Sequence, residues 1–394
     1  MRIVARVLFA LPVLCGFAAA AIAAPAPRSV PPVQFDWRQF RLDQAHTGFN
    51  RFEHVLNVAN VPSLGNTWQA QLGDIVFSSS PAVVGGVVYI GSIDGTLWAY
   101  PADGCGADLC ETPLWQSTNL AQIIDSPTVA DGIVYVGSQT SFDSNDGLLN
   151  AFAANGCGAP VCAPLWQGMA GKESILESSP AVGGGFVYVG AFDGRLYAFA
   201  AGGCGHATCA PLWTGDLGSA VFESTPAVAN GVVYMVSQHA LSAFDAHGCG
   251  APSCAPLWQA VDEKQFFNGS PAIAYGRVYV ALEFGLAVYA ADGCGAATCP
   301  PLWLLLAGGF QADVESSPTV ANGVVYAGRN TGEVLAWPAE PCGTFVCKNL
   351  WSGMTRDVIV NSSPTVIDGK LYIGSADDGF PENIAGRVYV FELP

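Results

Sequence analysis

A motif that recurs seven times along the chain is the strongest constraint on its fold. Each copy begins with Ser-Pro or Thr-Pro, followed by Ala or Thr and then by Val or Ile. A glycine follows, and a tyrosine preceded by an apolar residue ends the motif. The motif prolines lie 45 to 53 residues apart and are Pro81, Pro127, Pro180, Pro226, Pro271, Pro318 and Pro364. A tryptophan precedes each motif, and these are Trp68, Trp115, Trp166, Trp213, Trp258, Trp303 and Trp351. So regular a period predicts a repeat architecture, not several unrelated domains.

Residues 176–213 show what one repeat is expected to form. Residues 180–182 read as a short apolar strand, and the three glycines after it suit a tight turn. Residues 186–190 form a second strand, Asp193-Gly194 a hairpin, and the alternating residues 195–200 a third strand. A turn with two cysteines then leads to a fourth strand at Trp213. Four short strands in about 45 residues correspond to one blade of a β-propeller.

The two ends of the repeat region complement each other. The strand at residues 67–72 has no blade of its own, and the last unit, residues 364–393, has no tryptophan strand after it. The sequence therefore predicts an all-β, seven-bladed β-propeller of four-stranded antiparallel blades over residues 67–394, closed by the N-terminal strand. A solenoid would leave two uncapped ends. An eighth blade from residues 35–56 is the alternative, but that stretch lacks the motif.

The N-terminus reads as an export signal. Arg2 and Arg6 precede an apolar stretch, and Ala21-Ile22-Ala23 has the small-x-small pattern of a cleavage site. We expect a signal peptide at residues 1–23, a lead-in segment at 24–66, and a secreted protein that is periplasmic or extracellular. A retained membrane anchor is the alternative. Lipid attachment at Cys15 is disfavoured, because the large residue Leu14 precedes it.

The charge balance narrows the partners. The formal net charge is −17, with only 12% charged and 51% hydrophobic residues. An acidic surface repels phosphate backbones and anionic lipids, so we expect no nucleic-acid partner and no membrane span after signal cleavage. We expect a monomer.

Twelve cysteines form six pairs with four residues between partners. Each pair lies in the turn between the third and fourth strands of a blade, and the pairs are Cys105/Cys110, Cys157/Cys162, Cys204/Cys209, Cys249/Cys254, Cys294/Cys299 and Cys342/Cys347. Evenly placed pairs in an exported chain predict disulfides, whose expected role is to hold the outer turn rigid. A metal site is the alternative, but it needs four ligands and one pair supplies two.

A polar residue recurs just before each motif proline. It lies three positions ahead in most units and two ahead at Asp125, and the candidates are Asp125, Glu177, Glu223, Asn268, Glu315 and Asn361, with Ser78 in the first unit. Because the innermost strands of a propeller line its channel, these side chains are expected to ring one channel mouth. There they are candidates for a ligand or Ca²⁺ site, since Ca²⁺ takes oxygen ligands. The alternative is that each one bonds a turn or a neighbouring blade.

The hairpins break the symmetry of the repeat. The position that holds Asp-Gly in regular blades holds Gln238-His239, Glu283-Phe284 and Arg329-Asn330 in three others, and residues 142–146 and 377–383 are insertions. Variable loops on a rigid scaffold are where binding commonly resides. Neutral drift is the alternative.

The repeats resemble the PQQ-enzyme-like propeller repeat. The resemblance rests on Ser-Pro-Ala-Val at 179–182, Val-Tyr-Val-Gly at 187–190, Asp-Gly-Arg-Leu-Tyr-Ala at 193–198, Leu-Trp at 212–213 and their equivalents, and residues 36–50 are similar to the lead-in of exported members. That family contains quinoprotein dehydrogenases, an outer-membrane-protein assembly factor and exported propellers without known activity, so its motifs specify the fold better than the function.

The sequence departs from the enzymes of this family. It has no adjacent cysteine pair and no Cys-x-x-Cys-His, and no other catalytic motif is found. We therefore expect no catalytic residues and no cofactor. The expected function is that of a non-catalytic binding or scaffold protein of the cell envelope or extracellular space, with a protein or small-molecule ligand on one propeller face. The alternative is a quinoprotein-like dehydrogenase with PQQ and Ca²⁺ at the channel mouth.

Overall fold

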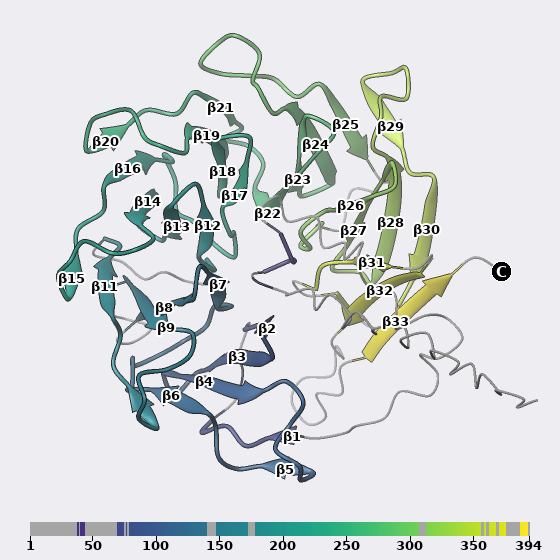
Figure 1. Cartoon of the computed structure of the whole chain (residues 1–394). Coiled ribbons are helices and arrows are strands. Elements are labelled where there is room, and N and C mark those ends of the chain that lie inside the picture. Colours follow the sequence, from purple (N-terminus) through teal and green to yellow (C-terminus); the bar gives the residue numbers. More distant parts are fainter. Residues whose placement is uncertain are drawn as a thin grey trace, which may run out of the picture. The chain divides into compact units, whose positions relative to one another are not determined.

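The computed structural model describes residues 38, 40–43, 69–74, 76, 79–139, 147–171, 178–306, 313–355, 358–359, 362–367, 370–375 and 387–392. All of them lie in the compact unit Phe35–Pro394. Their regular structure consists of strands β1 to β33 (Figure 1). In this part of the chain, no helix has the length and apolar character needed to cross a membrane. The predicted signal peptide lies outside the described residues.

The strands form successive antiparallel sheets, or blades, in chain order, which confirms the predicted propeller. Blade 1 contains β2 (Ala82–Val84), β3 (Val87–Ser92), β4 (Thr96–Pro101) and β6 (Trp115–Ser117). Blade 2 contains β7 (Thr128–Ala130), β8 (Ile133–Gln139), β9 (Gly147–Ala153) and β11 (Trp166–Met169). Blade 3 contains β12 (Ala181–Gly183), β13 (Phe186–Ala191), β14 (Arg195–Ala200) and β16 (Trp213–Asp216). Blade 4 contains β17 (Ala227–Ala229), β18 (Val232–Ser237), β19 (Ala240–Asp245) and β21 (Trp258–Val261). Blade 5 contains β22 (Phe267–Ala274), β23 (Arg277–Leu282), β24 (Gly285–Ala290) and β25 (Trp303–Leu306). Blade 6 contains β26 (Thr319–Ala321), β27 (Val324–Gly328), β28 (Glu333–Pro338) and β30 (Trp351–Met354). Blade 7 contains β31 (Thr365–Ile367), β32 (Lys370–Ser375) and β33 (Arg387–Glu392).

Within the unit, the first strand of each blade is innermost and the last is outermost (Figure 1). Consecutive antiparallel strands reverse direction, so the turns fall on two faces. The turns after first and third strands share one face, which carries the cysteine loops and is named here the cysteine face. The other face carries the hairpins between second and third strands, together with the links from one blade to the next. It is named here the hairpin face.

Aromatic side chains join each blade to the next. The tyrosine of a second strand packs against the tryptophan of its own blade, as Tyr188 does against Trp213 with ring centroids 6.1 Å apart. The Tyr188 hydroxyl also donates a hydrogen bond of 2.7 Å to the carbonyl of Ala246 in the next blade. Four further tyrosines make the same inter-blade bond at 2.7–2.9 Å, namely Tyr89, Tyr135, Tyr234 and Tyr279.

A line of hydroxyl groups links the inner ends of the blades. In the first six units, the backbone N–H of the residue before the motif proline donates to the hydroxyl of its counterpart in the next blade, at 2.9–3.2 Å. The residues so linked, in order, are Ser80, Ser126, Ser179, Thr225, Ser270, Ser317 and Ser363. The Ser or Thr of the motif thus makes the contact between blades, through both its N–H and its hydroxyl. The proline beside it has no N–H and cannot donate.

The six predicted disulfides are all present, and the cysteine loops of blades 2 to 6 reach across to the preceding blade. Short strands in these loops pair in parallel with a neighbouring strand: β5 (Leu109–Cys110) with β1 (Gln69–Ala70), β10 (Val161–Cys162) with β6, β15 (Thr208–Cys209) with β11, β20 (Ser253–Cys254) with β16, and β29 (Val346–Lys348) with β25. The fifth loop makes the same contact as a bridge between Thr298 and Gln259. We name these contacts clasps.

Each pair lies in the predicted turn between the third and fourth strands, but its two cysteines differ in exposure. The first cysteine of every pair is exposed. The second is at most 5% exposed, and these buried residues are Cys110, Cys162, Cys209, Cys254, Cys299 and Cys347. Cys299 belongs to the same core cluster as Trp258, and Cys347 to that of Trp303, each with the tryptophan of the preceding blade. The clasp is the physical reason, because it carries the second cysteine onto the neighbouring blade and buries its side chain there.

The clasp pattern also locates the N-terminal strand. In every other clasp the partner strand is the fourth strand of the preceding blade, and β1 takes that place relative to the loop of blade 1. This is the position expected for the strand that closes the propeller.

Part of the lead-in segment lies among the inner strands. The Arg38 carbonyl accepts a bond of 2.7 Å from Val129 in blade 2, and the buried Arg41 guanidinium donates to the Thr319 hydroxyl in blade 6. Burial lowers the pKa of Arg41 to about 9, and the nearby Asp43 offsets part of that effect. Residues 38–43 therefore bridge two blades that are not neighbours in the chain.

Candidate binding hollow

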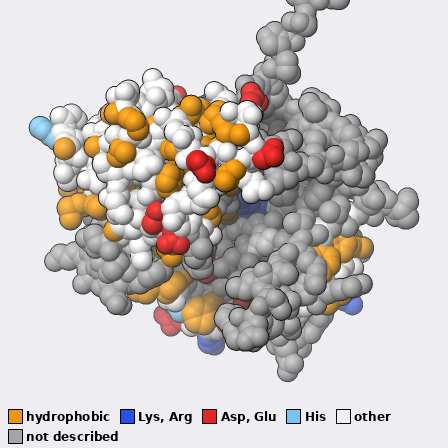
Figure 2. All heavy atoms as spheres, turned by 90° about the horizontal axis from the view of Figure 1, so that it is seen from below, with side chains coloured by type: hydrophobic (Ala, Val, Ile, Leu, Met, Phe, Trp, Pro, Cys, Tyr) orange, Lys and Arg blue, Asp and Glu red, His pale blue; other side chains and the backbone are white. Residues whose placement is uncertain are grey.

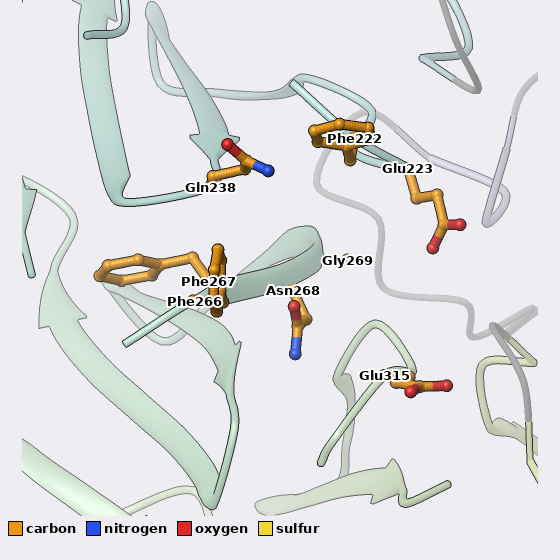
Figure 3. Close-up of a pocket in the computed structure, with 8 residues that line it drawn as sticks. All are labelled: Phe222, Glu223, Gln238, Phe266, Phe267, Asn268, Gly269 and Glu315. Atoms are coloured by element: carbon orange, nitrogen blue, oxygen red, sulfur yellow. The ribbon is translucent and has the colours of Figure 1, made fainter. Parts of the chain in front are cut away.

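A hollow of about 380 Å³ lies between the inner ends of blades 4, 5 and 6. Its lining residues come from the links that lead into these blades and from one hairpin: Phe222, Glu223, Gln238, Phe266, Phe267, Asn268, Gly269 and Glu315. Figure 3 shows the polar ends of Glu223, Asn268 and Glu315 round one open space, with Phe222 and Gln238 beside them. The hollow therefore opens on the hairpin face.

An irregular first strand in blade 5 helps shape the hollow. Strand β22 has eight residues where the other first strands have three, and its register with β23 shifts between Asn268 and Ala272. Gly269 occupies the place of a serine and adopts φ 64°, where a Cβ would come within 3.1 Å of the Ser317 backbone. Phe267 and Asn268 lie at the start of this irregular strand and line the hollow.

Glu223 enters the hollow from a strained backbone position. Its φ is 48°, in the left-handed region that residues other than glycine, asparagine and aspartate rarely adopt. Such strain costs on the order of 1 kcal/mol and is commonly found at functional sites. The side chain is exposed, so its carboxylate is available to a ligand.

Glu315 is half-buried, and its pKa lies above the usual range for a glutamate. Burial raises its pKa, the Asn330 amide that donates to Oε1 at 3.2 Å lowers it, and Asp313 and Glu223 raise it again. Glu223 and Glu315 therefore lie close enough to repel each other, and a cation between them would relieve that repulsion.

Aromatic rings form the apolar part of the site. Phe222 and Phe266 are 42% and 44% exposed, although large apolar side chains usually gain from burial. Phe222 packs edge-on against Phe192 at 4.7 Å, and Phe266 packs against the His239 ring at 4.9 Å. These contacts hold both rings in place while leaving a face of each to solvent.

The structure brings together three of the candidates singled out in the sequence. Glu223, Asn268 and Glu315 line the hollow, and Asn268 also donates from Nδ2 to the Val314 carbonyl at 3.1 Å. Asp125 lies elsewhere: it is buried inside blade 2, where Oδ2 accepts the Gly137 N–H at 2.7 Å. The remaining candidates lie outside the described residues, and they are Ser78, Glu177 and Asn361.

Sequence reasoning missed the phenylalanines. A faint signal exists, since Phe222 and Phe267 occupy the position four before the motif proline, where several other units have Ile, Leu or Val. Gln238 was singled out as part of an irregular hairpin, and it does line the hollow.

The described lining of the hollow can be compared with what PQQ held with calcium would need. Ca²⁺ takes six to eight oxygen ligands, and the described residues contain no group of three His, Cys, Asp or Glu placed to hold a metal ion. PQQ carries carboxylates of its own, and among the described residues that line the hollow there is no Lys or Arg to pair with them.

The fold defines a class of protein, a β-propeller with PQQ-like repeats, and the hollow is a candidate site on it. The family model described as outer membrane protein assembly factor BamB matches residues 58–203 and 162–393, so the chain belongs to this family of PQQ-like repeat proteins. A comparison with curated proteins found no match.

Solved structures agree in fold. BamB from Moraxella catarrhalis is 19% identical with a TM-score of 0.58, covering 78% of this chain and 85% of that one. Quinohemoprotein alcohol dehydrogenases are also similar. The one from Comamonas testosteroni is 14% identical with a TM-score of 0.55, and the match covers 91% of this chain and 80% of that one. The one from Pseudomonas putida HK5 is 12% identical with a TM-score of 0.53, and the match covers 87% of this chain and 76% of that one. Identities this low show the shared fold alone.

Proposed function

We propose that this protein is an exported, non-catalytic binding protein of the cell envelope or extracellular space, and that its hollow takes a basic, aromatic segment of a partner protein. The observation that carries the proposal is the composition of the hollow: exposed phenylalanines beside two carboxylates, with no Lys or Arg in the lining. Arg and Lys side chains bind both carboxylates and aromatic faces, so they match this lining.

The wider surface supports a cationic partner. Figure 2 shows acidic side chains spread between apolar and neutral ones over the described part of one face. A net charge of −17 steers a basic segment toward the protein and speeds its encounter at low salt.

A direct test uses a labelled peptide with two arginines flanking a phenylalanine, and a matched peptide with glutamates in place of the arginines. Only the basic peptide should bind, as measured by fluorescence anisotropy. Its affinity should increase as the pH rises through the raised pKa of Glu315, because the ionised carboxylate attracts the cationic peptide. Glu315→Gln should weaken binding about fivefold, corresponding to roughly 1 kcal/mol. Glu111→Gln, an exposed carboxylate in a cysteine loop, is the control.

Two results would overturn the proposal. Equal binding of the acidic peptide would show that the hollow does not select cations. Stoichiometric retention of added PQQ with Ca²⁺, together with dye-linked alcohol oxidation, would show that the protein is an enzyme. Export is tested separately, by sequencing the N-terminus of the protein recovered outside the cytoplasm.

A further inference from the structure

Two hairpins that break the repeat lie beside the hollow, in blades 4 and 6. In regular blades the hairpin carries an aspartate that bonds within its own hairpin. Asp193 of blade 3 accepts the Tyr197 hydroxyl at 2.6 Å, and Asp94 of blade 1 accepts a serine hydroxyl at 2.5 Å. Blades 4 and 6 hold Gln238-His239 and Arg329-Asn330 at this position instead. Their side chains contact the links that line the hollow, as the next two paragraphs describe.

The Asn330 amide is held in one orientation and donates to Glu315. Its Oδ1 accepts the Asp313 N–H at 3.2 Å, and its own backbone N–H donates to the Asp313 carbonyl at 3.0 Å. Because Oδ1 is used as an acceptor there, Nδ2 is the atom left to face Glu315, and it donates to Oε1 at 3.2 Å. A hydrogen bond of this kind favours the ionised carboxylate and fixes its orientation.

His239 packs against the exposed Phe266 ring from the other hairpin, with ring centroids 4.9 Å apart. The histidine is itself anchored on both sides. Its backbone N–H donates to the Ser219 hydroxyl at 3.1 Å, and its carbonyl accepts the Asp262 N–H at 3.0 Å. The ring atom Nδ1 lies 3.2 Å from the Gln265 carbonyl. An exposed ring without such a neighbour samples several rotamers, so His239 fixes the face that Phe266 presents to the hollow.

We propose that Asn330 and His239 are the positioning residues of the hollow: Asn330 orients the carboxylate that attracts the partner's cationic group, and His239 orients the aromatic ring against which the partner segment packs. This inference rests on the proposed function and names the residues that set its specificity. Neither residue belongs to the lining, so each acts through the group that it holds. Groups held in place before binding lose less conformational entropy when a ligand arrives, which strengthens binding.

The charged groups round Glu315 allow the role of Asn330 to be isolated. Burial raises the pKa of Glu315, the Asn330 amide lowers it, and Asp313 on the same link and Glu223 on the link into blade 4 raise it. Arg329, beside Asn330 on the hairpin, pairs with Glu333 at 2.9 Å. Asn330→Leu is neutral and of similar size, so it removes the hydrogen bond to Glu315 and leaves all these charges in place.

The first measurement uses the whole protein without any ligand. The Glu315 carboxyl is titrated by carbon-13 NMR, and Glu315→Gln assigns its signal. In Asn330→Leu it should titrate at a higher pH than in the wild type, because the ionised form has lost a donor. In His239→Ala the Phe266 ring protons should move toward their random-coil shifts, and His239→Phe, which keeps a ring at this position, should restore them. Asp94→Ala, in a regular hairpin, should change neither signal.

The second measurement uses the labelled peptide with two arginines flanking a phenylalanine. Asn330→Leu should bind it about threefold more weakly at the lower pH values, and the difference should close as the pH rises to 8 and Glu315 ionises. His239→Ala should bind about threefold more weakly at pH 8 as well, since the loss there is of packing and cation–π contact. His239→Phe should bind within twofold of the wild type.

An unchanged Glu315 titration in Asn330→Leu would overturn the role of Asn330, and unchanged Phe266 shifts in His239→Ala would overturn that of His239. A loss of affinity that is equal at every pH in Asn330→Leu would also count against it, because that is the sign of a general structural defect. Failure of the wild type to bind the peptide would overturn the proposed function, whereas the two NMR measurements need no peptide and still decide whether these residues hold Glu315 and Phe266. Circular dichroism verifies that the variants are folded.

Discussion

At the scale of single residues, Asp125 is the side chain whose burial is hardest to reconcile with its charge. In three other blades the same position holds a serine whose hydroxyl accepts the N–H of a second-strand glycine: Ser79, Ser178 and Ser316. Asp125 makes this bond with one oxygen, and its Oδ1 is buried without a partner. Burial raises its pKa well above the usual value, although the backbone N–H of Gly137 lowers it.

We predict that Asp125→Ser stabilises the protein at neutral pH by about 1–2 kcal/mol, the cost of an unsatisfied buried polar group. The gain should depend on pH. The folded state holds its proton at a pH where the unfolded state has lost it, so wild-type stability falls as pH rises above about 4 until the raised pKa is reached. Denaturant unfolding at several pH values between 4 and 8 measures this slope.

The reverse substitution in blade 3, Ser178→Asp, is the matched control. It should lose stability and acquire the slope that Asp125→Ser removes. If Asp125→Ser changes stability equally at pH 4 and pH 8, ionisation of Asp125 is not the cause.

At the scale of elements, the cysteine loops act between blades. The sequence placed the six pairs correctly, because even spacing within a repeat is a local signal. It indicated only a rigid outer turn, and so missed the burial of the second cysteine of each pair, such as Cys299 and Cys347. The parallel pairing of Ser253 with Thr214 joins residues 39 positions apart across a blade boundary, and no local pattern encodes such a pairing. The structural role of the loops therefore became visible only with the fold.

We predict that removing one disulfide loosens the preceding blade. In a variant with Cys249→Ala and Cys254→Ala, the Thr214 N–H should exchange faster, because its acceptor Pro252 lies in the loop that is no longer closed. Global stability should fall by about 2 kcal/mol, the chain-entropy value for so short a loop. Removing Cys157 and Cys162 instead should affect Gln116 and leave Thr214 unchanged. Faster exchange confined to the loop itself would contradict the clasp role.

At the scale of the whole molecule, the repeat made the blade architecture predictable. Proline, glycine and tryptophan recur at fixed positions, and each has a local structural meaning. The hollow was only partly predictable. The regular spacing indicated Glu223, Asn268 and Glu315, but the phenylalanines lie just ahead of these positions, in the links into blades 4 and 5, and Gly269 makes the first strand of blade 5 irregular. A departure from symmetry of this kind depends on contacts between blades, such as that of Gly269 with Ser317.

The lead-in segment gives the last prediction, since it ties together blades that the repeat alone leaves far apart in the chain. Deleting residues 36–43 removes the carbonyl that accepts the Val129 N–H and the guanidinium that donates to Thr319. Hydrogen exchange at Val129 should therefore accelerate, because an N–H in the first strand of blade 2 loses its partner. Val182 and Val228 hold the same position in blades 3 and 4 and are the internal controls. Equal acceleration at all three positions would mean that the deletion loosens the propeller generally, and that residues 38–43 do not act as a specific tie between blades 2 and 6.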